Sequence, residues 1–142
     1  MTWLPRRIVV VPIDFSDDSF GALAPASELA EDPTHLHAIH VLPVLEPTEP
    51  GIIWHTIDDE TRSKHAEDAL RKQLDQRGHE GIGTAIRFGD PGHQIAEYAD
   101  HVGAGLIVVP SHGRNPLKRL LIGSVTDRIV RLAHCPVLVL KD

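Results

Sequence analysis

The chain has 142 residues, of which 42% are hydrophobic and 24% charged, and its formal net charge is −6. This length suits one domain over residues 1–142, and the ordinary composition excludes collagen-like, low-complexity and wholly disordered proteins. The acidic balance argues against a nucleic-acid partner, and no apolar run approaches the roughly 18 residues that would cross a membrane.

The cysteine content and the N-terminal residues indicate which cellular compartment to expect. The single cysteine, Cys135, excludes an internal disulfide and a zinc site made of several cysteines. The first fifteen residues hold no long apolar segment that ends in a small-residue cleavage site, so we expect no secretory signal. These features predict a reduced, cytoplasmic protein.

The first part of the chain predicts two strands separated by a helix. Residues 7–12 are a short apolar run rich in β-branched side chains, which is typical of a fully buried strand. Ser16 is a candidate N-cap for a helix that runs to about residue 30. Pro25 should kink or interrupt that helix. Residues 36–42 predict the second strand.

A long loop and a polar helix come next. Residues 43–57 contain three prolines and a glycine, and a loop of this length is usually functional or disordered. Asp58 to Gly78 has the pattern of a helix with one narrow apolar stripe. The stripe consists of Ala66, Ala69, Leu70 and Leu74.

The rest of the chain predicts three more strands and two more helices. The strands are expected at residues 84–88, 106–109 and 136–140. One helix follows the turn at residues 89–92 and buries Ile95, Ala96, Ala99 and Val102. The other is expected to begin with Ser124 as its N-cap and carries the apolar residues Val125, Ile129 and Val130.

The alternation of strands and helices predicts the fold class. It indicates an α/β protein with a single doubly wound sheet of five mainly parallel strands and helices on both faces. In such sheets, ligands bind beyond the carboxyl ends of the strands, at the point where the strand order reverses. The loops after the first, second and fourth strands are therefore the places to search for a site.

The loop after the fourth strand carries the residues best suited to a phosphate site. It reads Pro110-Ser111-His112-Gly113, then nine residues, then Gly123-Ser124-Val125-Thr126. A glycine at 113 lets the backbone approach a ligand closely, and Gly123-Ser124 opens a helix whose free N–H groups favour an anion. The alternative is an ordinary turn glycine followed by an ordinary serine cap.

Basic residues gather in the same part of this acidic chain. They suggest a local anion site, and the alternative is a solvated helix face. The residues are Arg114, Lys118, Arg119, Arg128 and Arg131.

Residues 110–141 resemble the C-terminal signature of the universal stress protein family. That signature, Gly-x2-Gly-x9-Gly-Ser/Thr, holds the ribose and phosphates of ATP in the family. Residues 9–16 resemble the family's first strand and acidic turn, and residues 89–109 its third helix and fourth strand. The resemblance implies ATP, with or without Mg²⁺, as the ligand and a strand order of 3-2-1-4-5.

The site residues implied by the resemblance come from four segments. Asp14 matches an acidic residue that contacts the nucleotide in ATP-binding members of the family. Val41 occupies the position whose backbone typically recognises adenine in those members. Pro110 departs from the signature, since it occupies the place of the first glycine and removes an N–H. The full candidate set is Pro12, Ile13, Asp14, Val41, Val109, Pro110, His112, Gly113, Gly123, Ser124 and Val125.

The resemblance also implies a regulatory module that acts by binding in the stress response. It implies a homodimer through the last strand, Pro136–Leu140, and further regulatory protein partners. We expect neither catalytic residues nor a dedicated metal site, because no His-Glu-x-x-His helix and no P-loop occur. Two alternatives stay open: a slow ATPase or phosphotransferase, and a dimeric structural module that no longer binds nucleotide.

Overall fold

The computed structural model describes residues 3–45, 58–110 and 122–141. The elements follow one another in the alternating order that the sequence predicts. They are β1 (Val9–Pro12), α1 (Asp17–Gly21), α2 (Leu23–Leu29), η1 (Pro33–His35), β2 (Leu36–Leu42), α4 (Asp59–Gln76), β3 (Gly83–Phe88), α5 (Pro91–Val102), β4 (Leu106–Pro110), α6 (Ser124–Leu132) and β5 (Val137–Leu140).

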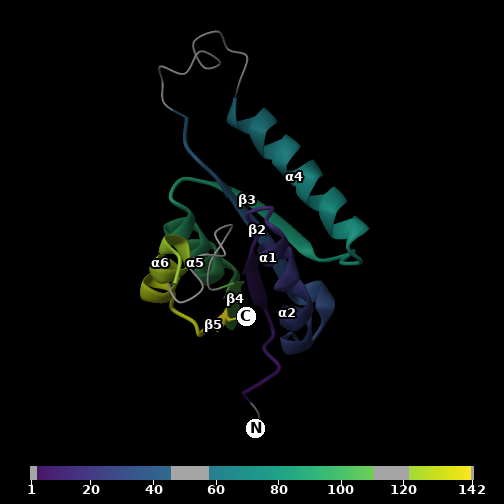
Figure 1. The fold of residues 1–142 in the computed structure, drawn as a ribbon, viewed down its shortest axis with the longest axis vertical. Coiled ribbons are helices and arrows are strands. Elements are labelled where there is room, and N and C mark those ends of the chain that lie inside the picture. Colours follow the sequence, from purple (N-terminus) through teal and green to yellow (C-terminus); the bar gives the residue numbers. More distant parts are fainter. Residues whose placement is uncertain (1–2, 46–57, 111–121, 142) are drawn as a thin grey trace.

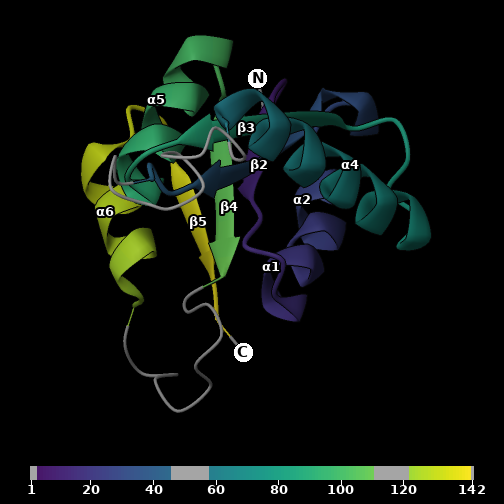
Figure 2. The ribbon, with the colours of Figure 1, turned by 90° about the horizontal axis from the view of Figure 1, so that it is seen from above.

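All five strands belong to one sheet with the order β3-β2-β1-β4-β5. Every pairing between neighbouring strands is parallel. The sheet lies between two layers of helices, with α5 and α6 on one face and α1, α2 and α4 on the other (Figures 1 and 2). The predicted doubly wound α/β fold and its strand order are confirmed.

Each face of the sheet has its own apolar core, because side chains alternate along a strand. Val9 and Val11 of β1 face α1, α2 and α4, where Leu70 and Leu74 of α4 are fully buried. Val10 faces α5 and α6 instead. Since both faces are covered, β1 and β4 at the centre of the sheet consist of apolar residues, and their sequences show no alternation with polar ones.

The first predicted helix is interrupted one turn before Pro25. α1 and α2 meet at Ala22, and the side chain of Ser16 caps α1 by accepting a hydrogen bond from Ser19 N. Pro25 has no N–H for the carbonyl of Gly21, and its ring would collide with that carbonyl in a continuous helix. The expected N-cap and the expected interruption are both confirmed.

The last predicted helix begins differently from expectation. Its N-cap is Gly123, with φ −64° and ψ 158°, and Ser124 is already the first helical residue. An N-cap residue precedes the first helical residue and typically has an extended backbone, as Gly123 does, so Ser124 inside the helix does not fill that role. Of the apolar residues on this helix, Val125 and Val130 are not buried. They are 40% and 47% exposed, because α6 packs on the sheet along the narrow line of Thr126 and Ile129.

Two further expectations concern the middle of the chain. Ala69 was expected in the apolar stripe of α4 but is exposed, because it lies about 100° around the helix from the buried Leu70. Of the predicted loop at 43–57, residues 46–57 lie outside the described part of the structure. Among the described residues, no helix is both long enough and apolar enough to span a membrane.

Candidate functional site

A crevice opens where β1 and β4 separate. The two strands pair only through Val9 and Val10 of β1. Beyond these residues β1 stays paired with β2 as far as Pro12, while β4 stays paired with β5 as far as Pro110. A proline has no N–H, so neither Pro12 nor Pro110 can donate a backbone hydrogen bond to a neighbouring strand where β1 and β4 diverge. This is the reversal of strand order at which doubly wound sheets bind ligands.

The crevice contains a cavity of about 270 Å³ on the face covered by α5 and α6. It brings together the predicted site residues from four separate segments of the chain. Those that line it are Pro12, Ile13, Asp14, Val41, Val109, Pro110, Gly123, Ser124 and Val125. The other two candidates, His112 and Gly113, lie outside the described residues.

Several lining residues were not predicted from the sequence. The sequence had placed Ile95 and Ile129 on the apolar faces of their helices, which pack on the sheet. This apolar pattern was the available signal that the two residues could also line a cavity at the strand ends. Thr126 stands in the segment that carries the phosphate motif. The unpredicted lining residues are Ser19, Ile39, His40, Pro91, Ile95, Thr126 and Ile129.

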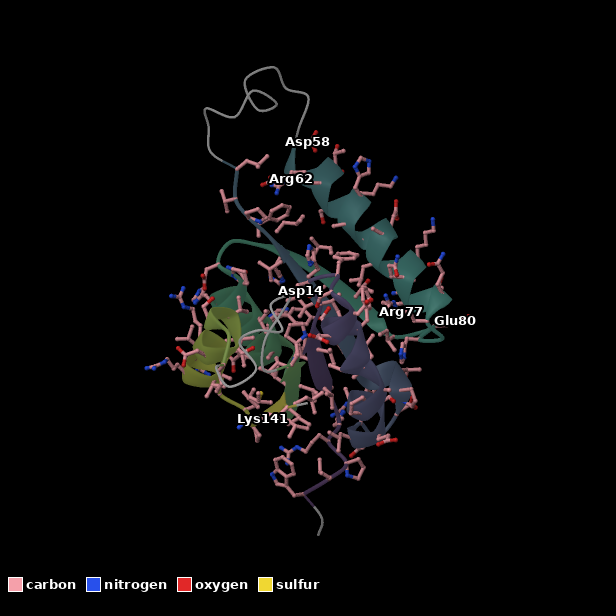
Figure 3. All side chains as sticks on the ribbon, viewed as in Figure 1. Asp14, Asp58, Arg62, Arg77, Glu80 and Lys141 are labelled. Atoms are coloured by element: carbon pink, nitrogen blue, oxygen red, sulfur yellow. The ribbon has the colours of Figure 1, made fainter. Side chains whose placement is uncertain are left out.

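The turn between β1 and α1 is held by a small hydrogen-bond network around Asp14. Asp14 Oδ1 accepts from the backbone N–H of Ser16 at 2.9 Å and also from the Ser16 hydroxyl. The buried Ser19 hydroxyl donates to Ser16 O at 2.9 Å and accepts from Asp14 N at 3.3 Å. These bonds fix the carboxylate at the end of β1, in the middle of the molecule (Figure 3).

Phe15 gives this turn an uncommon backbone. Its φ is +66°, in the left-handed region that side-chain-bearing residues seldom adopt. Its ring packs edge-on against His40 at 4.8 Å and against Phe20 at 5.9 Å between centroids. His40 Nδ1 is in turn 2.6 Å from the carbonyl of Ile13. Since a carbonyl only accepts, Nδ1 carries the proton, and β2 thereby supports the strand end that lines the cavity.

The start of α6 forms the opposite side of the cavity. α1, α4 and α5 each begin with a side chain that accepts from a first-turn N–H, whereas α6, like α2, has an N-cap residue that makes no side-chain hydrogen bond, here Gly123. The Thr126 hydroxyl donates to the carbonyl of Pro110 at 3.0 Å and ties this turn to the end of β4. N–H groups at such a helix start favour an anion.

The two described residues of the basic cluster, Arg128 and Arg131, pair with different carboxylates. Arg128 forms an ion pair with Asp90 at 2.8 Å, and Arg131 forms one with Asp127 at 3.0 Å. Both arginines are exposed, and both lie outside the set of residues that line the cavity. The other three basic residues belong to the segment that the structure does not describe. Among the described residues, no arginine or lysine therefore lines the cavity.

The described histidines and the cysteine offer little further chemistry. No group of three or more His, Cys, Asp or Glu side chains in residues 3–45, 58–110 and 122–141 is placed to hold a metal ion. Burial raises the pKa of the Cys135 thiol, which disfavours the reactive thiolate. The cavity itself offers apolar walls, one carboxylate at Asp14, and N–H groups at the start of α6.

The chain was compared with known proteins. The model of the universal stress protein family matches residues 5–141. Universal stress protein MJ0531 of Methanocaldococcus jannaschii is 35% identical over 140 residues, covering 94% of this chain and 81% of that protein. Universal stress protein YxiE of Bacillus subtilis is 33% identical over 145 residues, covering 94% and 97% of the two chains.

Solved structures that are similar to this chain are also universal stress proteins. Universal stress protein UspA from Lactobacillus plantarum is similar with a TM-score of 0.71 and 28% identity, covering 95% of this chain and 97% of that one. A universal stress protein in complex with cAMP is similar with a TM-score of 0.60 and 25% identity, covering 96% and 98%. The family model spans nearly all of the chain and the strand order is the one that the resemblance implied. The chain belongs to the universal stress protein family.

Proposed function

We propose that this protein is an ATP-binding regulatory module that acts in the stress response in the cytoplasm, through binding and dimerisation. One observation carries the proposal. The ends of β1 and β2 and the uncapped start of α6 line a single cavity at the point where β1 and β4 separate. A similar solved protein of the family is in complex with cAMP, which supports a nucleotide as the ligand class.

The cavity suits the parts of a nucleotide in different ways. Pro12, Ile13, Val41 and Val109 supply apolar walls for a base, and Asp14 supplies an acceptor for ribose hydroxyl groups. The start of α6 supplies N–H donors for phosphate. At about 270 Å³ the cavity is just below the usual range of ligand pockets, roughly 300–1,000 Å³, so it suits a nucleoside whose phosphates extend along α6.

Isothermal titration with ATP, in the presence and absence of Mg²⁺, tests the proposal. We expect saturable binding, with most of the ATP recovered unchanged when the complex is denatured and analysed by chromatography. Steady conversion to ADP would favour an ATPase or phosphotransferase instead. Binding absent up to millimolar nucleotide would favour the module that no longer binds nucleotide. Asp14 is the one carboxylate among the described lining residues, which is little for catalysis of phosphoryl transfer.

The dimer is proposed to form through β5. This strand is at the edge of the sheet, pairs with β4 on one side, and presents Leu138 at 38% exposure. An apolar edge strand whose second side is unpaired tends to pair with another chain. Two copies related by a two-fold axis would cover both edges at once, and this is the commonest symmetry of homo-oligomers.

A further inference from the structure

Asp90 and Arg128 link the two helices that form one wall of the cavity. Asp90 is the N-cap of α5, and Arg128 lies in the second turn of α6. Arg128 Nη1 donates to Asp90 Oδ1 at 2.8 Å. Neither residue is among those that line the cavity, yet each is adjacent in sequence to a residue that does, Asp90 to Pro91 of α5 and Arg128 to Ile129 of α6.

Both oxygens of the Asp90 carboxylate are engaged. Oδ2 accepts from the backbone N–H of His93 at 3.0 Å, which caps α5, and Oδ1 accepts from Arg128. The bond from His93, followed by the bond from Arg128, lowers the pKa of Asp90 below its ordinary value. The carboxylate is therefore charged and held in one orientation, unlike that of a mobile surface ion pair.

Gly92 lets the two helices come into direct contact beside this pair. Gly92 is buried, and a Cβ placed on it would lie 2.6 Å from Arg128 Cβ and 2.7 Å from Arg128 Cγ. Real atoms do not approach so closely, so any side chain at this position would push α6 away from α5. The separation of the helices is thus defined at Gly92 by the aliphatic part of Arg128 and by the backbone of α5.

We propose that Asp90, Gly92 and Arg128 form an interhelical clasp that sets the distance between the first turns of α5 and α6 and thereby the shape of the nucleotide cavity. Arg128 is in this view a positioning residue, which acts on the ligand through the placement of the α6 amide groups. The inference rests on the proposed nucleotide binding, and the experiment below separates the two.

The exposure of the pair distinguishes this role from a general contribution to stability. The side chains of Arg128 and Asp90 are 57% and 44% exposed. An ion pair as exposed as this contributes little to the free energy of unfolding. Breaking the clasp should therefore change ligand affinity more than it changes the melting temperature.

Two glutamine variants on the same helix form the central comparison. Arg128→Gln removes the charge that Asp90 binds and preserves helix propensity. Arg131→Gln makes the same change one turn further on, where Arg131 pairs with Asp127 within α6. The supporting variants are Asp90→Asn, which keeps an oxygen able to cap α5, Arg128→Lys, which restores a charge, and Gly92→Ala, which forces the helices apart.

The affinity for ATP is the first measurement. Arg128→Gln and Asp90→Asn should weaken ATP binding by about tenfold, and Arg128→Lys should recover part of the loss. Arg131→Gln should stay within about twofold of the unmodified protein, and the melting temperatures of the two glutamine variants should agree to within about 4 °C. An equal loss of affinity in both glutamine variants would overturn the clasp, because it would show a simple effect of charge on the polyphosphate.

Amide hydrogen exchange in the nucleotide-free protein is the second measurement. The amide of Asp127 donates to the carbonyl of Gly123 at 2.9 Å and reports the first turn of α6. Its protection should fall by about tenfold in Arg128→Gln and in Gly92→Ala, and not in Arg131→Gln. Unchanged protection in the first two variants overturns the clasp. If the unmodified protein binds no ATP, the proposed function fails, and this exchange measurement still decides whether the clasp exists.

Discussion

The hydroxyl of Thr126 donates a 3.0 Å hydrogen bond to the carbonyl of Pro110, and this bond joins the first turn of α6 to the end of β4. Thr126 is only 7% exposed, and both residues line the cavity. The two parts of the proposed phosphate site, which are separated along the chain by the segment 111–121, are therefore tied together in the wall of the cavity.

Replacing Thr126 by valine tests this tie. Thr126→Val preserves the shape of the side chain but leaves the Pro110 carbonyl without its donor, so the free energy of unfolding should fall by about 1–2 kcal/mol. ATP affinity should fall as well, because the start of α6 is no longer held against β4. Urea denaturation and isothermal titration measure the two effects. Thr126→Ser retains the hydroxyl and is the control, and a serine variant as weak as the valine variant would contradict the explanation.

Gly123→Val should abolish ATP binding and leave the fold intact. The backbone of Gly123, with φ −64° and ψ 158°, is accessible to any residue, so valine should not unfold the protein. Its side chain would instead occupy the place proposed for the phosphates. Titration with ATP and circular dichroism measure binding and fold. Binding as tight as in the unmodified protein would show that the phosphates lie elsewhere.

Ser124→Ala should lower the affinity for ATP, whereas Pro110→Gly should leave it equal or raise it. Ser124 does not cap α6, so its loss should leave stability nearly unchanged and should weaken ATP binding by roughly 1 kcal/mol through one lost donor. Pro110→Gly restores an N–H at the end of β4, so affinity should equal or exceed that of the unmodified protein, although glycine adds entropy to the free loop. The predicted order of affinity, measured by titration, is Pro110→Gly, Ser124→Ala and then Gly123→Val.

His37 should make the protein less stable in mild acid. Its Nδ1 is 2.8 Å from the Tyr98 hydroxyl, and burial, with a smaller contribution from His35, lowers the pKa of His37 below its usual 6.5. The unfolded chain therefore binds this proton more readily than the folded one. The stabilisation of the folded state by neutral His37 is therefore fully present above about pH 6.5. It is lost as the pH falls toward the lowered pKa that His37 has in the folded protein.

The comparison with His37→Gln isolates this group. Between about pH 7.5 and pH 5.5, the unmodified protein should lose more free energy of unfolding than the glutamine variant, which does not titrate in this range. Urea denaturation at each pH provides the measurement. Parallel pH dependences in the two proteins would show that other groups cause the loss.

Leu138→Lys should convert the proposed dimer into a monomer. The unmodified protein should have twice the chain mass of 15.6 kDa by light scattering at micromolar concentration. A charge at the centre of the β5 edge would have to be buried between two copies, which disfavours their pairing. Val44→Lys is the matched control, since Val44 is exposed at 68% and follows β2, which β1 and β4 separate from β5 in the sheet. A monomeric unmodified protein would rule the dimer out.

The order of the elements could be derived from the sequence because it depends on local chemistry. Short β-branched runs form strands when both faces are covered, and serine or aspartate before a polar segment starts a helix, as Ser16 and Asp58 do. Once the alternation is known, the position of a site at the carboxyl ends of the strands follows from the geometry of parallel sheets. The family resemblance then assigned individual residues to that site, and nine of them, from four segments, line the same cavity.

The partners of individual side chains were decided only by the tertiary structure. The sequence could not show that Arg128 is bound by Asp90, 38 residues earlier, rather than by a phosphate. Nor could it show that Thr126 bonds to Pro110, or that Gly123 rather than Ser124 is the N-cap of α6. The physical reason is that such contacts depend on strand register and on how closely two helices approach, here at Gly92. These are properties of packing between distant segments, which no local pattern of residues contains.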